Sequence, residues 1–295
     1  MTLPIYRAAD DPGPSFVDLL ARTGRDPAWK GPAPSEWTTI AGAHGVSVDM
    51  SRSIPYGTTV VAMRYGDGVV MAGDRQATSG NFISHRSLEK VFAADRHSGV
   101  AIAGAAGPAM EMVKLFQLQL EHYEKVEGAE LSLEGKANQL AQMVRSHLPA
   151  AMQGMPVVPL FAGYDTGRRT GRLFEYDVTG GRYEERDFAA TGSGSLHAGT
   201  VLKLGFREGG DADDALELVI NALFQAADED TATGGPDLVR GIFPVIATIT
   251  EAGFTRLDDP DVSERFRTLV DRLATTHGST SLGVAPSISE GDKTP

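Results

Sequence analysis

Thr58 is the residue whose surroundings first suggest chemistry. It follows Gly57 and opens the first dense strand-forming stretch of the chain, "TTVVAMRY" at 58–65. Threonine often begins a β-strand for conformational reasons alone. Here, however, the preceding glycine leaves its carbonyl unhindered and its backbone free to adopt positive φ, and we expect the ordered domain to begin at Thr58. Cleavage of the 57–58 bond would make Thr58 a new N-terminus.

An N-terminal threonine carries a nucleophile and a base on one residue. Its hydroxyl can attack a carbonyl, and its free α-amine titrates at about pH 7.7–8.0, so a useful neutral fraction can accept the hydroxyl proton. Before cleavage the same nitrogen belongs to an amide, which cannot act as a base. The sequence therefore predicts that residues 1–57 form a propeptide that masks the amine until the bond between Gly57 and Thr58 is cut.

Asp74 and Lys90 are the charged residues that would assist such a nucleophile. Asp74 lies in the strand-like stretch 68–75, and Lys90 stands at the entrance of the next one, 90–105. A buried Lys–Asp pair is commonly only structural. Beside Thr58, however, the ammonium would stabilise a developing alkoxide and lower the pKa of the α-amine, while the carboxylate would keep the lysine charged. Loss of either is expected to harm chemistry more than folding.

Glycine-rich turns supply candidate backbone donors. In "IAGAAG" at 102–107 a strand leads into a helix, where unpaired N–H groups accumulate, so the Gly104 N–H is a candidate oxyanion donor. A tight strand-to-helix turn is the alternative. The turns "TGSGS" at 191–195 and "EDTATGG" at 229–235 lack the GxxxxGK[ST] spacing of a phosphate loop. Ser193 also lacks the GxSxG frame of a serine hydrolase.

Composition excludes other classes of chemistry. The chain has 295 residues, no cysteine, seven histidines and a formal net charge of −12. The histidines show neither HxxH nor HExxH spacing, so we expect no metal and no cofactor. The acidic balance disfavours nucleic acid. No apolar run approaches the roughly 18–20 residues of a membrane span, and no secretory signal is found, so we expect a cytoplasmic protein that does not bind membranes.

The elements that must position these residues are grouped in blocks. The stretches assigned from their periodicity are strands in 58–75 and 90–105, helices at 108–127 and 132–151, strands at 157–165 and 171–178, helices at 195–207 and 212–228, strands at 239–250 and 253–257, and a last helix near 262–275. Blocks of strands and helices predict an α+β fold with two antiparallel sheets and helical layers. We expect the domain to span 58–276 and a disordered tail to follow at 277–295.

Several of these motifs, in order and with matching spacing, resemble one family. "GTTVVAMRYGDGVVMAGDR", "ISHRSLEKVF" and "GVAIAGAAGPAMEM" are similar to the start of a mature 20S proteasome β subunit. "LEHYEKVEG" and "AADEDTATGGPDLVRGIFP" most resemble the actinobacterial type. The resemblance covers roughly 58–257. It implies a four-layer αββα Ntn-hydrolase sandwich and a threonine-type endopeptidase, self-processed between Gly57 and Thr58, which degrades unfolded or tagged proteins.

The resemblance also assigns roles to individual residues. It implies that Thr58 is the nucleophile, with Asp74 and Lys90 as its charge partners and Gly104 as the oxyanion donor. Ser193 is similar to the family's serine beside the threonine amine. Two further residues, Asp230 and Thr233, match an Asp-x-x-Ser-Gly element in which this chain has threonine in place of serine and so retains the hydroxyl.

Substrate contacts are implied by the same matching. The resemblance places four apolar positions around the side chain that precedes the scissile bond: Ala77, Ile102, Ala106 and Met110. Thr78 and the Ala106 backbone would pair with an extended peptide as an added strand. The absence of charge among these positions predicts a preference for substrates with a hydrophobic residue before the cut.

Partners follow from the resemblance as well. It implies a homo-heptameric β ring stacked on a second β ring, capping by proteasome α subunits, and delivery of tagged protein substrates by a ring ATPase regulator. Helix 108–127 is a candidate inter-ring contact. Three alternatives stay open: a non-catalytic ring subunit, an Ntn amidase for small molecules, and a simpler two-ring bacterial threonine peptidase. The intact Thr58, Asp74 and Lys90 disfavour the first, the run of motifs the second, and the extra C-terminal elements the third.

Overall fold

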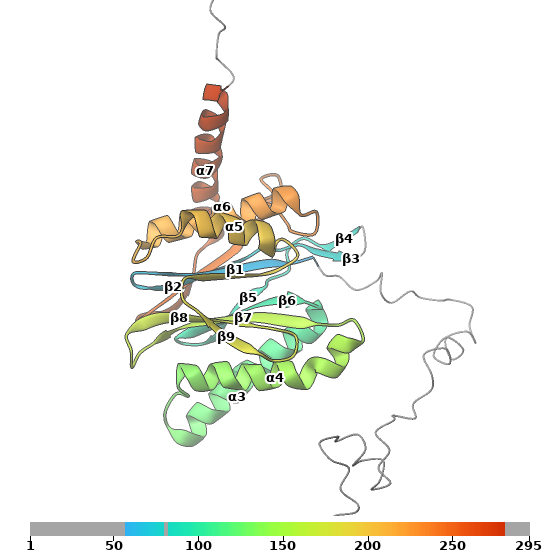
Figure 1. The fold of residues 1–295 in the computed structure, drawn as a ribbon, viewed down its shortest axis with the longest axis vertical. Coiled ribbons are helices and arrows are strands. Elements are labelled where there is room, and N and C mark those ends of the chain that lie inside the picture. The colour runs from blue at the N-terminus through green and yellow to red at the C-terminus, as the bar shows by residue number, and fades with distance from the viewer. Residues whose placement is uncertain (1–56, 80–81, 281–295) are drawn as a thin grey trace, which may run out of the picture. The chain divides into compact units, whose positions relative to one another are not determined.

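The computed structural model describes residues 57–79 and 82–280, which belong to one compact unit. The expected propeptide as far as residue 56 and the tail from residue 281 lie outside the described residues. Within the described part, two antiparallel sheets lie face to face and helices cover the outer face of each (Figure 1). The predicted α+β sandwich of two antiparallel sheets is therefore confirmed.

The first sheet holds Thr58 at the start of its central hairpin. Its strand order is β10-β1-β2-β11-β12, with bounds Phe188–Gly192, Thr59–Tyr65, Gly68–Gly73, Val245–Thr250 and Gly253–Arg256. Every residue of β2 is buried, because one face of this sheet meets the second sheet and the other meets helices. The register pairs Thr59 with Gly192, which places the β10 end beside the residue after Thr58.

The second sheet carries Lys90 at its entrance and Gly104 at the end of its second strand. Its order is β5-β6-β7-β8-β9, with bounds Val91–Asp95, Ser98–Gly104, Val157–Asp165, Thr170–Tyr176 and Arg182–Glu185. A separate hairpin of β3 (Ala77–Ser79) and β4 (Phe82–His85) precedes it. This hairpin was not predicted, because all four β4 residues are exposed and show no alternation of buried and exposed positions.

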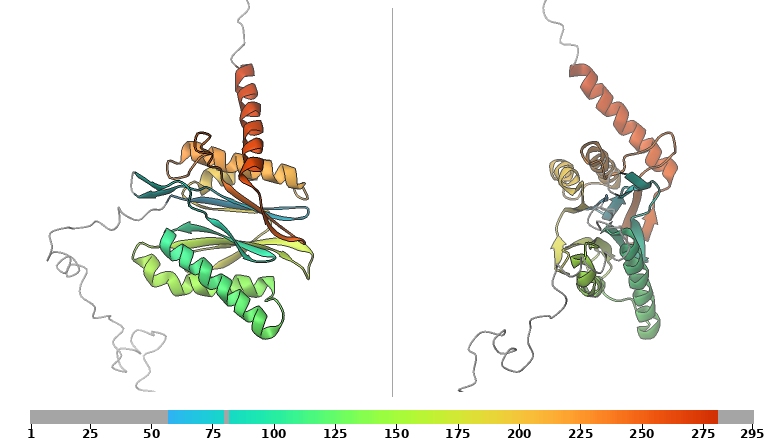
Figure 2. Two further views of the ribbon diagram at one scale, coloured as in Figure 1. Left: turned by 180° about the vertical axis from the view of Figure 1, so that it is seen from behind. Right: turned by 90° about the vertical axis from the view of Figure 1, so that its right-hand side faces the viewer.

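Helices form the two outer layers, as the views in Figure 2 show. They consist of α3 (Ala106–Glu127) and α4 (Leu133–Met152) on the second sheet and of α5 (Ser195–Gly205) and α6 (Ala212–Glu229) on the first. The last helix, α7 (Asp259–Thr280), projects away from these layers (Figure 2). Gly128 ends α3 as predicted: it adopts φ 70° and its N–H bonds to Glu124. The helix α7 begins before the predicted residue 262 and continues to Thr280.

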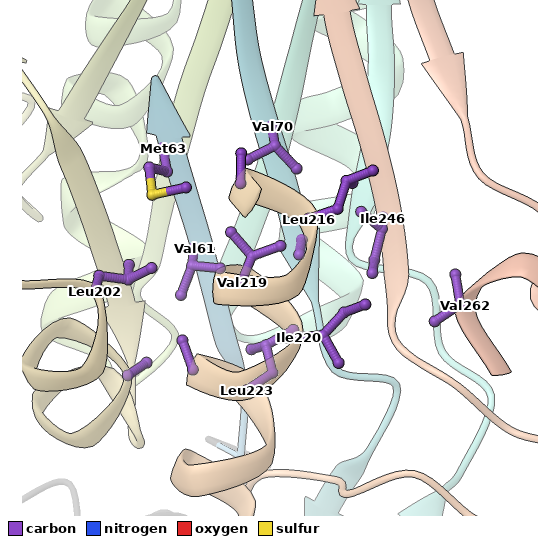
Figure 3. Packing of buried hydrophobic residues seen from close by; sticks show 14 of the residues in the cluster. Val61, Met63, Val70, Leu202, Leu216, Val219, Ile220, Leu223, Ile246 and Val262 are labelled. Atoms are coloured by element: carbon purple, nitrogen blue, oxygen red, sulfur yellow. The ribbon is translucent and has the colours of Figure 1, made fainter. Parts of the chain in front are cut away.

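Three apolar clusters hold the layers together. One fills the space between the sheets with residues such as Val60, Met71 and Leu160. A second packs α3 and α4 on the second sheet around Phe116 and Phe161. The third packs α5 and α6 on the first sheet, and Figure 3 shows its side chains, among them Val61, Leu202, Val219, Ile220 and Ile246. The strand β1 therefore has a core on both of its faces, which fixes the position of the residue at its start.

One strand boundary was predicted wrongly. The apolar run from Val239 was expected to be strand throughout, but β11 begins at Val245. The preceding residues form a turn with an isolated bridge between Asp237 and Ile242, and Gly241 adopts φ 65°. Pro244 has no N–H to donate to a ladder, so the sheet starts after it.

Candidate active site

Thr58 lies immediately before β1 and is only 5% exposed. Its carbonyl accepts a hydrogen bond from the Ser193 backbone N–H at 2.8 Å, and the Ser193 hydroxyl oxygen lies 3.3 Å from the same carbonyl oxygen. Its Oγ1 donates to the carbonyl oxygen of Gly57 at 2.7 Å. A Cβ on Gly192 would stand 1.9 Å from the Thr58 carbonyl oxygen. The close approach of β10 therefore requires glycine there and locks the backbone of Thr58.

Gly57 is required for steric reasons. A Cβ at this position would lie 2.4 Å from the carbonyl oxygen of Ala232 and 2.6 Å from the hydroxyl oxygen of Thr78. Real Cβ atoms do not approach backbone that closely, so a side chain here would displace the 230–234 loop. Glycine was predicted here because it leaves its carbonyl unhindered, and the structure adds a second reason: there is no space around its Cα for a side chain. The residue before Thr58 fits only because it is glycine.

Lys90 faces the carbonyl of Gly57 from a buried position. The side chain is almost completely enclosed, and its Nζ donates to Asp74 Oδ1 at 2.7 Å, to the Gln76 carbonyl at 2.5 Å and to the Gly57 carbonyl at 3.2 Å. An ammonium has three protons and no lone pair, so these three acceptors use all of them. Burial lowers the pKa of Lys90, and the charge of Asp74 opposes this shift.

Asp74 is fully buried and accepts four hydrogen bonds. Its Oδ1 accepts from Lys90 and, at 2.8 Å, from the backbone N–H of Thr59. Its Oδ2 accepts from the backbone N–H groups of Gln76 and Gly234, both at 2.9 Å. A buried carboxylate without such donors would be strongly unfavourable. The structure therefore brings together the three charged or nucleophilic residues that the sequence indicated.

Asp230 organises a second cluster on the other side of Thr58. It caps α6, and its Oδ2 accepts from the hydroxyls of Ser193 and Thr233, each at 2.5 Å, while its Oδ1 accepts from the Ala232 N–H at 3.1 Å. Burial raises the pKa of Asp230, but the hydrogen bonds from Ser193 and Thr233 outweigh it, so the pKa is lowered. Threonine at 233 keeps the hydroxyl contact expected of the family's serine.

Gly104 ends β6 in a conformation that needs glycine. Its φ is 108°, and a Cβ there would lie 2.1 Å from the carbonyl oxygen of Pro156. The Ala105 N–H donates to Pro156, whereas the Ile102 N–H donates to Lys90 on the opposite side. Because N–H directions alternate along a strand, the Gly104 N–H is directed to the Lys90 side, where β5 has not yet begun. The role of the Gly104 N–H as an oxyanion donor stays a prediction.

The expected substrate contacts lie on three elements, β3, β6 and α3. Ala77 and Thr78 are buried on β3, and Thr78 stands next to Gly57. Ile102 belongs to the apolar cluster under α3, and Met110 packs against the same cluster. Ala106, the first residue of α3, is half-buried. These five residues therefore come from the two segments that flank Lys90 in the chain.

Four functional contacts were missed from sequence. Thr59 donates its N–H to Asp74, the Gln76 carbonyl holds Lys90, and Gly194 and Gly234 donate backbone N–H groups into the two clusters. All four residues act in these contacts through main-chain atoms, which leave no side-chain signature. Thr59 also contributes its side-chain hydroxyl, but threonine at the start of a strand is common for conformational reasons and gives no functional signal.

Within 57–79 and 82–280, no group of three or more His, Asp or Glu side chains is arranged to hold a metal ion. In the same ranges no helix combines the length and apolar character needed to cross a bilayer.

Comparisons with known proteins agree on one family. A family model described as "Proteasome subunit" matches residues 54–239. A "Proteasome subunit beta" of Acidimicrobium ferrooxidans is 55% identical over 264 residues, covering 90% of this chain and 92% of the relative. The Streptomyces griseus protein of that name is 59% identical over 74% of this chain and 78% of its own length. That of Jonesia denitrificans is 49% identical over 90% of this chain and 84% of its own. The matched region spans both carboxylate clusters.

Proposed function

The chain belongs to the family of proteasome β subunits, and on this premise we propose that it is a catalytic one. It is a threonine-type endopeptidase that exposes its own nucleophile by removing residues 1–57. The observation that carries the proposal is the convergence on one carbonyl: Gly57 accepts hydrogen bonds from both the Thr58 hydroxyl and the Lys90 ammonium. This is the bond that self-processing must break.

Self-processing begins with the attack of Thr58 Oγ1 on the carbonyl carbon of Gly57. The Lys90 ammonium, 3.2 Å from the carbonyl oxygen, stabilises the negative charge that forms there. All three Lys90 protons are engaged, so a water molecule is the better candidate for the base that takes the hydroxyl proton. That proton passes to the Thr58 nitrogen as the peptide bond breaks, and water then hydrolyses the resulting ester. The released α-amine completes the catalytic residue.

Substrate hydrolysis uses the same hydroxyl with the new amine as its base. Thr58 Oγ1 attacks the scissile carbonyl, the Gly104 N–H stabilises the oxyanion, and the α-amine protonates the leaving nitrogen. Water then releases the acyl group from Thr58. The apolar residues on β3 and at the start of α3 favour a hydrophobic residue before the cut. We therefore expect peptides with leucine, phenylalanine or tyrosine there to be cleaved faster than those with charged residues.

Assembly is part of the proposed function. Membership of the family implies a proteasome built with other subunits. We propose a homo-heptameric β ring stacked on a second one, capped by α subunits in the cytoplasm and supplied with tagged substrates by a ring ATPase. A non-catalytic ring subunit is disfavoured by the complete set of Thr58, Asp74 and Lys90 contacts.

Intact-mass analysis tests the proposal directly. The chain is co-expressed with its α partner as wild type, Thr58→Ala and Thr58→Ser. We expect the wild-type chain to lose residues 1–57 and to cleave fluorogenic peptides, and Thr58→Ala to retain them and to be inactive. Thr58→Ser keeps a hydroxyl and should retain part of both activities. A mature wild-type chain that begins at another residue, or turnover by Thr58→Ala, would refute the assignment.

A further inference from the structure

Thr59 is linked to both carboxylates of the site. Its backbone N–H donates to Asp74 Oδ1 at 2.8 Å. Its hydroxyl oxygen lies 2.6 Å from the hydroxyl oxygen of Thr233, which in turn lies 2.5 Å from Asp230 Oδ2. The Gly194 N–H donates to the same Thr59 hydroxyl at 2.9 Å. A single residue, adjacent to the nucleophile, thus contacts three separate segments, those of Asp74, Gly194 and Thr233.

The donor in each of these contacts can be assigned. The Gly194 N–H can only donate, so Thr59 Oγ1 accepts from it. The single hydroxyl proton of Thr233 goes to the Asp230 carboxylate, because a charged acceptor makes the stronger bond. Thr59 must therefore donate its own proton to Thr233 Oγ1. The result is a directed chain from Gly194 through Thr59 and Thr233 to Asp230.

Burial makes this chain of hydrogen bonds rigid. Thr59 has no exposure and Thr233 is 3% exposed, so water cannot replace a lost partner. A Cβ on Gly194 would stand 2.6 Å from Thr59 Oγ1 and 2.7 Å from Thr233 Oγ1. The segments of Thr59, Gly194 and Thr233 are packed so closely that the hydroxyl oxygens of Thr59 and Thr233 have no room to move. Any shift of the 230–234 loop is therefore transmitted to the start of β1.

We propose that the Thr59 hydroxyl is a positioning group, which fixes Thr58 relative to the loops that carry Ser193 and Asp230. It touches neither the scissile bond nor the substrate. It acts through the backbone of Thr58, whose carbonyl accepts a hydrogen bond from the N–H of Ser193, the residue before Gly194. The proposal rests on the assignment of Thr58 as the nucleophile.

The test compares Thr59→Val with Thr59→Ser in the full-length chain co-expressed with its α partner. Valine keeps the β-branched shape and removes the hydroxyl, whereas serine keeps the hydroxyl and removes the methyl. A displacement of about 1 Å near reacting atoms can cost on the order of 100-fold in rate, so we expect kcat of Thr59→Val to fall by about 10- to 100-fold with little change in KM. Thr59→Ser should recover most of the loss. Self-processing should also be slower in Thr59→Val than in Thr59→Ser.

Two controls separate positioning from general destabilisation. Thr248→Val makes the same change at a half-buried threonine of β11 and should leave kcat unchanged. Thr233→Val removes the next hydroxyl of the hydrogen-bond chain. If the two hydroxyls act as a unit, the kcat of the double variant with Thr59→Val should equal that of the less active single variant. Where Thr59→Val fails to assemble, Thr233→Val and Thr59→Ser provide the comparison.

The outcomes distinguish this inference from the proposed function. Turnover by Thr58→Ala would refute both. Loss of turnover in Thr58→Ala together with wild-type kcat in Thr59→Val and additive effects in the double variant would overturn the positioning role alone. Equal losses in Thr59→Ser and Thr59→Val would also overturn it, because the hydroxyl would then not be the active feature. Recovery by serine, with non-additive valine variants, would support it.

Discussion

Replacing Asp74 with asparagine tests whether one buried carboxylate holds the site together. Asp74 accepts from Lys90 and the Thr59 N–H on one oxygen and from the Gln76 and Gly234 N–H groups on the other. Asparagine has nearly the same volume but only one acceptor oxygen. Its amide NH₂ must face one of the two pairs. Whichever way it turns, two buried donors lose their acceptor.

The magnitude follows from the two orientations. If the NH₂ group faces Gln76 and Gly234, two buried N–H groups are left unpaired at about 1–3 kcal/mol each. If it faces Lys90, a buried ion pair is broken, which costs about 3–5 kcal/mol. Both orientations therefore predict a destabilisation of about 4 kcal/mol. For a domain of this size that corresponds to a fall in Tm of about 10 °C.

The chemical consequence falls on Lys90. Burial already lowers the pKa of Lys90, and the attraction of Asp74 works against that shift. Without the carboxylate the pKa of Lys90 falls further, and the charged hydrogen bond from Lys90 to the Gly57 carbonyl is weakened. Loss of one donor of this kind costs about 10²–10³ in kcat. We expect self-processing of Asp74→Asn to slow by that factor, and peptide turnover to fall with it, because a chain that keeps residues 1–57 has no free α-amine at Thr58.

The assay measures three quantities on full-length chains co-expressed with the proposed α partner: Tm by differential scanning fluorimetry, removal of residues 1–57 by intact mass, and peptide turnover. Asp67→Asn is the matched control, because Asp67 lies exposed in the β1–β2 turn, and it should behave as wild type. The reasoning is refuted if Asp74→Asn has the wild-type Tm and processes and cleaves at the wild-type rate. A lowered Tm with full activity would remove the role assigned to the Lys90 charge.

Three further predictions use residues around the site and in the second sheet. Gly104→Ala should lower Tm and turnover, because its φ of 108° and the Pro156 oxygen 2.1 Å from the new Cβ leave no room for a side chain; a wild-type Tm would contradict this. Arg172, which is 5% exposed, forms ion pairs with carboxylates from α4, β7 and β9. Arg172→Met should therefore lower Tm and leave turnover per assembled particle unchanged, whereas Arg168→Met, at the surface, should leave Tm unchanged as well. Burial raises the pKa of Asp230, but its hydrogen bonds lower it below the ordinary aspartate range, so its stabilisation is complete above about pH 5 and is lost as the pH falls through the folded-state pKa. Asp230→Asn should flatten that acid limb of Tm against pH, and an unchanged limb would argue against it.

Elements with a clear period were predicted well from sequence. The apolar spacing in 108–127 and 212–228 corresponds to α3 and α6, because a helix that packs on a sheet must bury one stripe of side chains. The β3–β4 hairpin escaped prediction because its exposed residues carry no such pattern. The run from Val239 was, in contrast, predicted to be strand from its start, where no strand forms. It is apolar, yet Pro244 and the turn before it keep its first half out of the sheet.

The candidate site divides in a similar way. Thr58, Asp74 and Lys90 could be named from their types and from their places beside strands, and the structure brings them within hydrogen-bonding distance of one another or of a shared carbonyl. Thr59 and Gly234 could not, because their contacts depend on which way a buried hydroxyl or backbone N–H points. That direction is decided when two distant loops pack together.

The sequence by itself determined which side chains are available and which faces of the elements must be buried, because both follow from residue type and local periodicity. Only the tertiary structure decided which distant groups meet. Thr59 and Thr233 are 174 positions apart, yet their hydroxyl oxygens lie 2.6 Å from each other. That distance results from the packing of α6 on the first sheet and from the loop that ends it. No local pattern encodes it, since it depends on how all the layers fit together.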